Sequence, residues 1–347
     1  MAINYQLLAF TSFIFLLSVG PKVAYTSDIG VFCGRHRSRL PSPAKVVTMY
    51  QSNQIGRMRL HEPDPDMFKA LRGSGIQVTV GVKNEDIKKI ATSYNAAIDW
   101  VSKNIRAYWP DVHFRYISVG NEAIPGNSAQ FILPAMENLH NALSYGELWQ
   151  RIKVTTIVSP SVMNITFPPS DANFSVKNTG YLIPIAQFLQ GIGAPLLTNV
   201  YPYYDHAKSP KQTPLSYALF ASGKDVFVDC GKGYRNSFDA TIDAFYTSLE
   251  KISTPNVSIV VAETGWPSAG NNKAASIFYA WLYNSNLIKH VLSAQGTPKR
   301  PGVETETYLF SMFNEEKRLG GKTMTNFGLF YPDMKPVYPI DFNATTE

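Results

Sequence analysis

Short runs of apolar and β-branched residues alternate along the chain, from Asp28 onward, with longer segments whose apolar positions follow a helical period. This alternation is typical of parallel strands joined by crossover helices. Eight runs have the length and composition of strands: 29–33, 57–61, 77–82, 114–119, 153–158, 196–201, 258–262 and 307–313. Seven segments between them are helix-like: 44–52, 66–73, 95–108, 129–148, 181–189, 238–252 and 275–292.

The eight strand–helix units predict an α/β protein built as a single (β/α)8 TIM barrel. An open doubly wound sheet is the alternative, but no glycine-rich phosphate loop follows any strand. Since no linker or change of composition divides the chain, we expect one domain over residues 28–342, with a short tail at 343–347. The connection at 203–233 is long enough to shape a cleft at the top of the barrel.

The first residues predict a secreted protein. An apolar run at 7–17 is too short to span a bilayer comfortably, and small and polar residues follow it, which indicates a signal peptide at 1–27 with its cleavage site somewhere in 23–27. A buried N-terminal helix is the alternative. Four sequons fit a secretory route, and no later stretch is long and apolar enough for a membrane span; the sequons begin at Asn164, Asn173, Asn256 and Asn343.

The net charge and the cysteine content limit which surfaces, metals and cofactors this protein could bind. The net charge of +6 favours acidic surfaces such as polyanionic cell walls, whereas the scattered Lys and Arg residues argue against nucleic acid. Cys33 and Cys230 form no metal-binding pattern, and we expect neither metal nor cofactor. A disulfide between them is one alternative, but we favour two buried free thiols, because a hydrophobic core of this size does not need a disulfide for stability.

Two glutamates stand where catalytic residues of a barrel enzyme belong. Glu122 directly follows the fourth predicted strand, and Glu263 directly follows the seventh. The carboxyl ends of barrel strands carry the active sites of TIM-barrel enzymes. Either glutamate alone could cap a following helix. The two together predict chemistry that needs a pair of carboxyl groups.

Glycoside cleavage is such a chemistry. One carboxyl group protonates the leaving oxygen, and the other attacks the anomeric carbon, at a separation of roughly 5 to 5.5 Å in retaining enzymes. Strands four and seven lie across a barrel mouth, which allows Glu122 and Glu263 to approach to this separation. Asn121 is placed to hydrogen-bond a sugar hydroxyl near the reacting carbon.

Several motifs closely resemble those of the plant endo-1,3-β-glucanases of glycoside hydrolase family 17. They occur in family order: IGRMRL at 55–60, YISVGNEAIPG at 116–126, NVYPY at 199–203, VVAETGWPSAG at 260–270, MFNE at 312–315 and NFGLFYP at 326–332. The resemblance implies a metal-free, retaining endo-hydrolase of linear 1,3-β-glucan of the callose or laminarin type. It implies Glu122 as the acid/base, Glu263 as the nucleophile and Glu315 as a further acid of the active site.

Other positions are interpreted with both a functional and a structural alternative. Tyr201 ends the sixth strand, where its ring could stack on a sugar. Trp266 could be a sugar platform or a packing anchor. The chain departs from the family pattern at Cys33, at His61 and at Arg318, where relatives carry Tyr, Tyr and Lys. We expect these changes to affect rate and fine specificity, without removing either essential carboxylate.

Three alternatives to 1,3-β-glucan hydrolysis stay open at this point. Relatives of similar sequence cleave mixed-linkage 1,3;1,4-β-glucan, and a transglycosylase would use the same residues. A glucan-binding wall protein without activity is the third, although it would have no need of a matched acid and nucleophile. We expect a monomer in the extracellular space, with the vacuole as the alternative, and roles such as plant defence are open.

Overall fold

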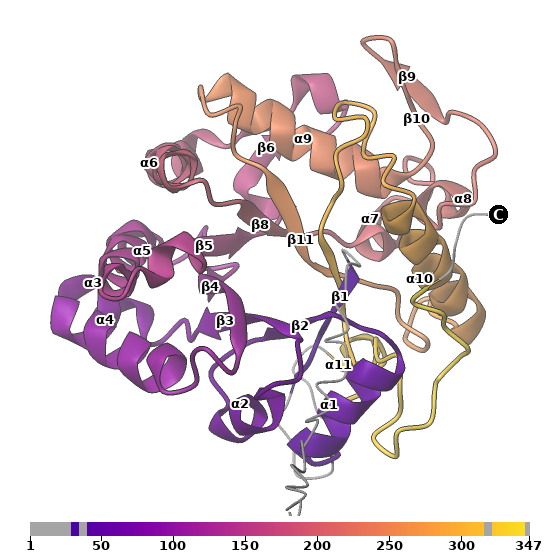
Figure 1. Cartoon of the computed structure of the whole chain (residues 1–347). Coiled ribbons are helices and arrows are strands. Elements are labelled where there is room, and N and C mark those ends of the chain that lie inside the picture. The colour runs from indigo at the N-terminus through magenta and orange to yellow at the C-terminus, as the bar shows by residue number, and fades with distance from the viewer. Residues whose placement is uncertain (1–28, 35–39, 316–320, 344–347) are drawn as a thin grey trace, which may run out of the picture.

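The structure, a computed structural model, describes residues 29–34, 40–315 and 321–343. Eight parallel strands close into a barrel surrounded by helices (Figure 1). These strands are β1 (Ile29–Phe32), β2 (Arg57–Leu60), β3 (Gln77–Val82), β4 (His113–Asn121), β5 (Lys153–Val158), β8 (Leu196–Asn199), β11 (Ile259–Thr264) and β12 (Thr307–Leu309). They are neighbours in chain order, and β12 pairs with β1. The predicted TIM barrel is confirmed, and each predicted strand contributes to it.

Helices cover the outside of the barrel: α1 (Pro43–Ser52), α2 (Pro65–Leu71), α3 (Ile87–Thr92), α4 (Tyr94–Val101), α5 (Ala129–Ser144), α6 (Val176–Ile192), α7 (Pro202–Lys208), α8 (Leu215–Ala218), α9 (Ser237–Lys251), α10 (Ile277–Leu292) and α11 (Gly321–Met324). All seven predicted segments contain helix. The segment predicted at 95–108 changes to a π-helical turn at Ser102–Arg106. Helices α3, α7, α8 and α11 lie outside the predicted segments; all four are short, and α3 buries only Ile87 and Ile90.

Side-chain caps determine where several helices begin. Asp64 accepts hydrogen bonds from the first backbone N–H groups of α2. Asn236 accepts from the N–H of Asp239 in α9, and Ser276 accepts from the N–H of Tyr279 in α10. Each cap satisfies a donor that the helix itself leaves unpaired. The caps therefore set the length of the loops that precede these helices.

The core has two layers. The larger layer packs the outward faces of the strands against the helices. A smaller cluster fills the barrel itself: Tyr116, Ile157, Leu197, Val260, Ala262 and Tyr308. In β11, Val260 and Ala262 belong to the inner cluster and Val261 to the outer layer, as the two-residue period of a strand requires. The barrel is therefore packed with side chains.

A buried carboxylate occupies the end of the barrel where the strands begin. Glu306, directly before β12, is 6% exposed. It accepts hydrogen bonds from Arg115 at 2.7 Å, from the Tyr116 hydroxyl at 3.2 Å and from the Tyr308 hydroxyl at 2.8 Å. Since a buried charge is tolerated when it is paired and hydrogen-bonded, this cluster closes the lower end. Glu122 and Glu263 lie at the opposite ends of their strands.

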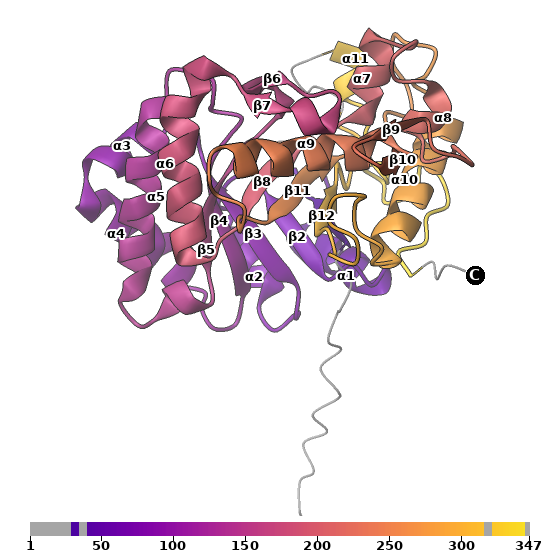
Figure 2. The same ribbon diagram turned by 90° about the horizontal axis from the view of Figure 1, so that it is seen from above.

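Two antiparallel hairpins stand outside the barrel: β6 (Met163–Ile165) with β7 (Asn173–Phe174), and β9 (Phe227–Asp229) with β10 (Lys232–Tyr234). The predicted long connection contains α7, α8 and the second hairpin, which lies beside α8 in both views (Figures 1 and 2). Ser170 donates its backbone N–H and its hydroxyl to Asp229, at 2.8 and 2.7 Å. The rings of Phe167 and Phe227 lie 4.7 Å apart. These contacts join the two hairpin regions.

Cys33 and Cys230 are not joined by a disulfide. Cys33 is buried at the end of β1, as expected, and its N–H donates to the carbonyl of Arg59 at 2.8 Å. Cys230 is exposed, so the expectation that it is buried is wrong. It lies in the tight turn between β9 and β10 with a backbone φ of 48°, and a hairpin turn on the surface has no core to enter.

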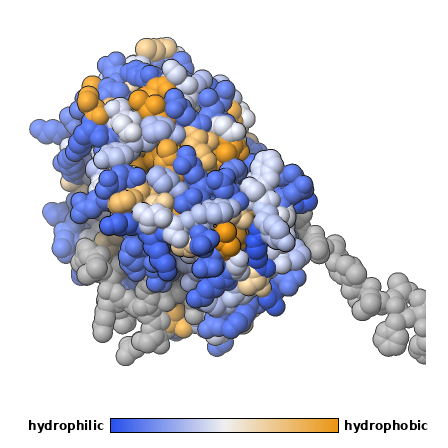
Figure 3. Space-filling view, turned by 90° about the vertical axis from the view of Figure 1, so that its left-hand side faces the viewer, coloured by the Kyte–Doolittle hydropathy of each residue, from blue (hydrophilic) through white to orange (hydrophobic). Residues whose placement is uncertain are grey.

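The surface is mainly polar on the face that carries α3 to α6, with apolar residues in scattered groups (Figure 3). Among the described residues, no helix has the length and apolarity needed to cross a membrane. Of the sequon asparagines, Asn164, Asn256 and Asn343 are exposed and Asn173 is half-buried. Glycosylation at these positions stays a prediction, and the expected signal peptide lies outside the described residues.

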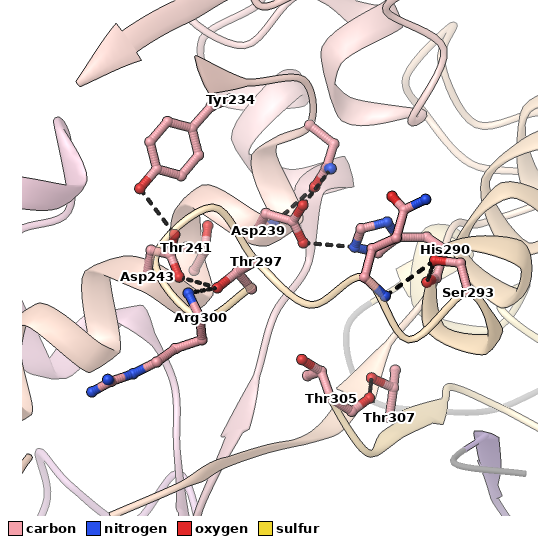
Figure 4. A network of polar contacts seen from close by, with 12 residues as sticks. Tyr234, Asp239, Thr241, Asp243, His290, Ser293, Thr297, Arg300, Thr305 and Thr307 are labelled. Carbon is pink, nitrogen blue, oxygen red and sulfur yellow. Dashed lines mark hydrogen bonds and ion pairs between the residues drawn. The ribbon is translucent and has the colours of Figure 1, made fainter. Parts of the chain in front are cut away.

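A second group of buried polar residues joins α9, α10 and the loop that follows α10 (Figure 4). Asp243 is fully buried; it accepts hydrogen bonds from the hydroxyl groups of Tyr234 and Thr297 and from the backbone N–H of Lys299. Nearby, Nε2 of His290 lies 2.8 Å from Oδ1 of Asp239. The arrangement fixes the two helices against each other, and none of these hydrogen bonds involves Glu122 or Glu263.

The His290–Asp239 pair predicts a pH-dependent contribution to stability. Burial lowers the pKa of His290, but the charge of Asp239 and its hydrogen bond raise that pKa above 6.5 overall. A raised pKa means that the contribution is complete below about pH 6.5 and is lost as the pH rises through the folded-state value. In thermal unfolding between pH 6 and 9, the melting-temperature advantage of the wild type over His290→Gln should therefore shrink as the pH rises.

The matched control is His140→Gln. Burial, followed by the charge of Lys153, lowers the pKa of His140. The sign is therefore opposite, and the advantage of the wild type over this variant should grow with pH. Parallel trends in the two variants would show that the pair with Asp239 does not cause the effect.

Candidate active site

Both predicted carboxylates emerge from strands with an irregular register. Glu122 directly follows β4, whose pairing with β5 shifts between Ser118 and Asn121. Glu263 lies near the end of β11, whose pairing with β8 shifts between Val261 and Glu263. A β-bulge re-aims the side chain beside it and is common next to active sites. The strand ends therefore set the direction of both glutamates.

The backbone at Glu122 is unusual. Its φ of 52° lies in the left-handed region, which a residue other than glycine adopts at a cost in free energy. Its N–H donates to the carbonyl of Ile157 at 2.9 Å, which holds this conformation. The side chain is exposed to solvent. Glu122 is thus presented to the open end of the barrel from a backbone that is held in place.

Glu263 has a different environment, since it is only 7% exposed. Arg59, on β2, donates from Nη1 to Oε1 of Glu263, and the hydroxyl of Tyr201 donates to Oε2 at 2.8 Å. Arg59 is 1% exposed, and its guanidinium lies 5.0 Å from the centroid of the Phe32 ring. A charged donor and a neutral donor together hold both oxygens of this carboxylate.

Two asparagines connect the glutamates. Asn199, the last residue of β8, donates from Nδ2 to Oε1 of Glu122 at 2.6 Å. Its Nδ2 also lies 3.3 Å from Oδ1 of Asn121, which accepts from Nη2 of Arg59 at 2.9 Å. The polar chain therefore runs from Glu122 through Asn199, Asn121 and Arg59 to Glu263. It brings together residues from four strands or strand ends.

Arg59, Asn199 and Asn84 were not among the predicted site residues. Asn84 exchanges hydrogen bonds with the backbone of Asn121, at 2.9 and 3.2 Å. Arg59 and Asn199 lay within recognised motifs, but no role was assigned to them. The sequence signal that could have found Arg59 is its place inside a predicted barrel strand, where a charged residue needs a partner.

The structure separates the two aromatic candidates. Trp266 is fully buried, and its indole N–H donates to the carbonyl of Ala274 at 2.7 Å. The centroids of the Trp266 and Tyr203 rings lie 5.2 Å apart. A ring enclosed in this way cannot present a face to sugar, so Trp266 is a packing anchor. Tyr201 is half-buried, and its hydroxyl contacts Glu263. Stacking of Tyr201 on a sugar stays a prediction.

The remaining predicted positions lie near the end of β1 or beyond the described residues. Glu315 is 5% exposed, and its Oε1 lies so close to Gly34 that a Cβ atom there would collide with it. Cys33 and His61 line a cavity of about 160 Å³. Arg318 lies outside the described residues. In the described part of the chain, no group of three or more His, Cys, Asp or Glu residues could hold a metal ion.

A closed parallel barrel with two glutamates at the ends of its strands, linked through Asn121, Asn199 and Arg59, defines a TIM-barrel protein with a site of the glycosidase type. The chain belongs to the glycosyl hydrolases of family 17, whose pattern it matches over residues 29–342. The family expected from the sequence motifs is therefore confirmed.

Relatives are similar over most of their length. An acidic glucan endo-1,3-beta-glucosidase of Nicotiana tabacum is 44% identical over 95% of this chain and 92% of its own. A glucan endo-1,3-beta-glucosidase of Vitis vinifera is 42% identical over 91% and 92%. Among solved structures, CJP38, a β-1,3-glucanase and pollen allergen of Cryptomeria japonica, has a TM-score of 0.88 at 42% identity, covering 90% of this chain and 98% of its own.

The buried Arg59–Glu263 pair predicts a large effect on stability. Arg59→Met would leave the Glu263 carboxylate buried without its cation, which costs about 3–5 kcal/mol of unfolding free energy at such sites. Urea denaturation measures the loss. Adding Glu263→Gln to Arg59→Met should recover part of it, because the unpaired charge is then removed.

The control for this cycle is Lys69→Met, which breaks an exposed ion pair with Asp66 and should leave the unfolding free energy nearly unchanged. The single variant Glu263→Gln completes the cycle, and a loss in the double variant equal to the sum of the two single losses would contradict a coupling between Arg59 and Glu263.

Proposed function

We propose that this protein is a secreted, retaining endo-hydrolase of 1,3-β-D-glucosidic linkages in 1,3-β-glucans, with Glu122 as the acid/base and Glu263 as the nucleophile. The observation that carries the proposal is the contrast between two linked glutamates. Glu263 is buried and held by a guanidinium and a hydroxyl, whereas Glu122 is exposed and receives a neutral amide.

The contrast suits two roles. A nucleophile must be held with its attacking oxygen toward the anomeric carbon, and the guanidinium of Arg59 and the Tyr201 hydroxyl fix the orientation of the Glu263 carboxylate. In the first step, Glu122 gives its proton to the glycosidic oxygen as the bond to the anomeric carbon breaks. Glu263 forms a new bond to that carbon on the opposite face, which produces a glycosyl-enzyme.

In the second step, Glu122, now ionised, takes a proton from water, and the water oxygen attacks the anomeric carbon and releases Glu263. The exposure of Glu122 supports this role, since water must reach the same group that protonated the leaving oxygen. Two inversions at one carbon give net retention.

Asn121 completes the proposed site. Its Oδ1 already accepts from Arg59 and Asn199, so its Nδ2 is the atom available for a sugar. A hydrogen bond to the 2-hydroxyl of the reacting sugar would strengthen in the transition state. Tyr201 and Glu315 are proposed to support the same site. Tyr201 does so through its hydrogen bond to Glu263, and Glu315 through its position beside Gly34, which follows β1.

The names of the relatives support 1,3-β-glucan as the substrate, since both plant relatives described above are named glucan endo-1,3-beta-glucosidases. Mixed-linkage 1,3;1,4-β-glucan is the second candidate. A solved structure that is 43% identical, with a TM-score of 0.86 over 90% of this chain and 100% of its own, comes from work on two plant β-glucan endohydrolases with distinct substrate specificities.

We also propose secretion after removal of residues 1–27, glycosylation at one or more of the sequon asparagines, and action as a monomer whose hydrolase domain spans 28–342. Exposed sequon side chains and a positive net charge support an extracellular destination in or near an acidic cell wall.

The release of reducing ends from laminarin and from barley mixed-linkage glucan tests the proposal. The wild type should cleave laminarin faster. Glu263→Gln should lower kcat by at least about 1,000-fold, because it removes the nucleophile, and Glu122→Gln should lower it by about 100- to 10,000-fold.

Binding to laminarin measured on the same preparations is the control, and it should persist in both variants. A wild type that binds both polymers and cleaves neither would support a wall-binding protein instead. Faster cleavage of the barley glucan than of laminarin would show that mixed-linkage 1,3;1,4-β-glucan is the preferred substrate.

A further inference from the structure

We propose that Asn199 is a positioning residue for the acid/base, and that its amide determines which oxygen of Glu122 carries the transferable proton. The inference rests on the proposed roles of Glu122 and Glu263. It concerns a residue of β8 that is 1% exposed and donates to Oε1 of Glu122 at 2.6 Å.

The hydrogen-bond network determines the orientation of both amides. Arg59 has only donors, so the atom of Asn121 that faces it must be the acceptor Oδ1. Asn199 faces that same oxygen at 3.3 Å and must therefore present its Nδ2 there. The same Nδ2 faces Glu122. The orientation of Asn199 thus follows from Arg59, two residues away along the polar chain.

Because the amide N–H of Asn199 donates to Oε1 of Glu122, this oxygen acts as a hydrogen-bond acceptor and cannot carry a proton toward Asn199. When Glu122 is protonated, its proton therefore belongs on Oε2. A carboxyl group that is exposed and otherwise free to rotate would distribute the proton between two oxygens and several rotamers. The amide removes this freedom, so the proton is delivered from one oxygen in one direction.

The same hydrogen bond serves both chemical steps. In the first step, the proton leaves Oε2 for the glycosidic oxygen, and the electron pair of the breaking bond stays with that oxygen. In the second, Oε2 takes a proton from the attacking water. Oε1 accepts from Asn199 throughout, so the site needs no reorganisation between steps, as expected for a preorganised donor.

The burial of Asn199 makes this arrangement rigid. Oδ1 of Asn199 is buried and has no hydrogen-bond partner in the described part of the chain. A buried acceptor left unpaired costs free energy, and such costs persist where function requires the side chain. Nδ2 of Asn199 donates to both Asn121 and Glu122, whereas its Oδ1 accepts no hydrogen bond from the described residues. This pattern fits a side chain whose role is to donate hydrogen bonds.

Two variants test the proposal. Asn199→Ala removes the amide, and Asn199→Asp keeps the shape but replaces the donor with an acceptor. With laminarin, kcat/KM should fall about 10- to 100-fold in Asn199→Ala and further in Asn199→Asp, while the affinity for a laminari-oligosaccharide changes less than about threefold.

The decisive comparison uses 2,4-dinitrophenyl β-laminaritrioside, whose leaving group departs without protonation. Its kcat/KM reports the first step alone, so it should change less than about threefold in Asn199→Ala. Thr198→Val is the matched control on the same strand. Thr198 is fully buried and its hydroxyl has no hydrogen-bond partner in the described part of the chain, so both substrates should react as with the wild type.

Equal losses of kcat/KM on laminarin and on the activated substrate would overturn the proposal, because a general disturbance of the site does not depend on the leaving group. Asn199→Asp with wild-type activity would also overturn it. Failure of the proposed function is a separate outcome, since the wild type itself would then cleave neither substrate. Thermal unfolding confirms that each variant is folded before its kinetics are compared.

Discussion

The geometry of the site depends on one buried cation, Arg59. A guanidinium that is 1% exposed inside a barrel is tolerated only where acceptors surround it. Arg59 reaches the Glu263 carboxylate and Oδ1 of Asn121 with its two terminal nitrogens, and this fixed fork sets the positions of both. Because Asn121 in turn orients Asn199, the side chain of Glu122 also depends on Arg59. One residue of β2 therefore coordinates groups from β4, β8 and β11.

The fold makes such a buried cation possible because the two ends of the barrel have different contents. Below Arg59, the inner apolar cluster and the Glu306 group fill the barrel and exclude water. Above it, the register shifts in β4 and β11 turn Glu122 and Glu263 toward the open end. The left-handed backbone at Glu122 is a local cost that the surrounding strands stabilise. The inner cluster and the Glu306 group therefore lie below Arg59, and the two candidate glutamates, with the strained backbone at Glu122, lie above it.

Much of this arrangement could be predicted from the sequence. The alternation of strand and helix patterns predicts the barrel, and the place of Glu122 and Glu263 after apolar runs predicts the site, because both signals are local. Partners that come from distant strands carry no such signal. Arg59 and Asn199 contact their glutamates across the barrel, so their roles became visible only in three dimensions. Burial is equally non-local, which is why Trp266 had two possible roles and why Cys230 was wrongly expected in the core.

In the proposed mechanism, Glu263 forms the covalent bond to the sugar and Glu122 transfers the proton. Incubation with a 2-deoxy-2-fluoro-β-laminaribiosyl fluoride, followed by mass spectrometry of the digested protein, tests it most directly, since the fluorine slows the second step and lets the intermediate accumulate. The account predicts one added glycosyl group, attached to the peptide that contains Glu263, and none in Glu263→Gln. Attachment at Glu122, or turnover of natural substrate with inversion and no labelling, would contradict it.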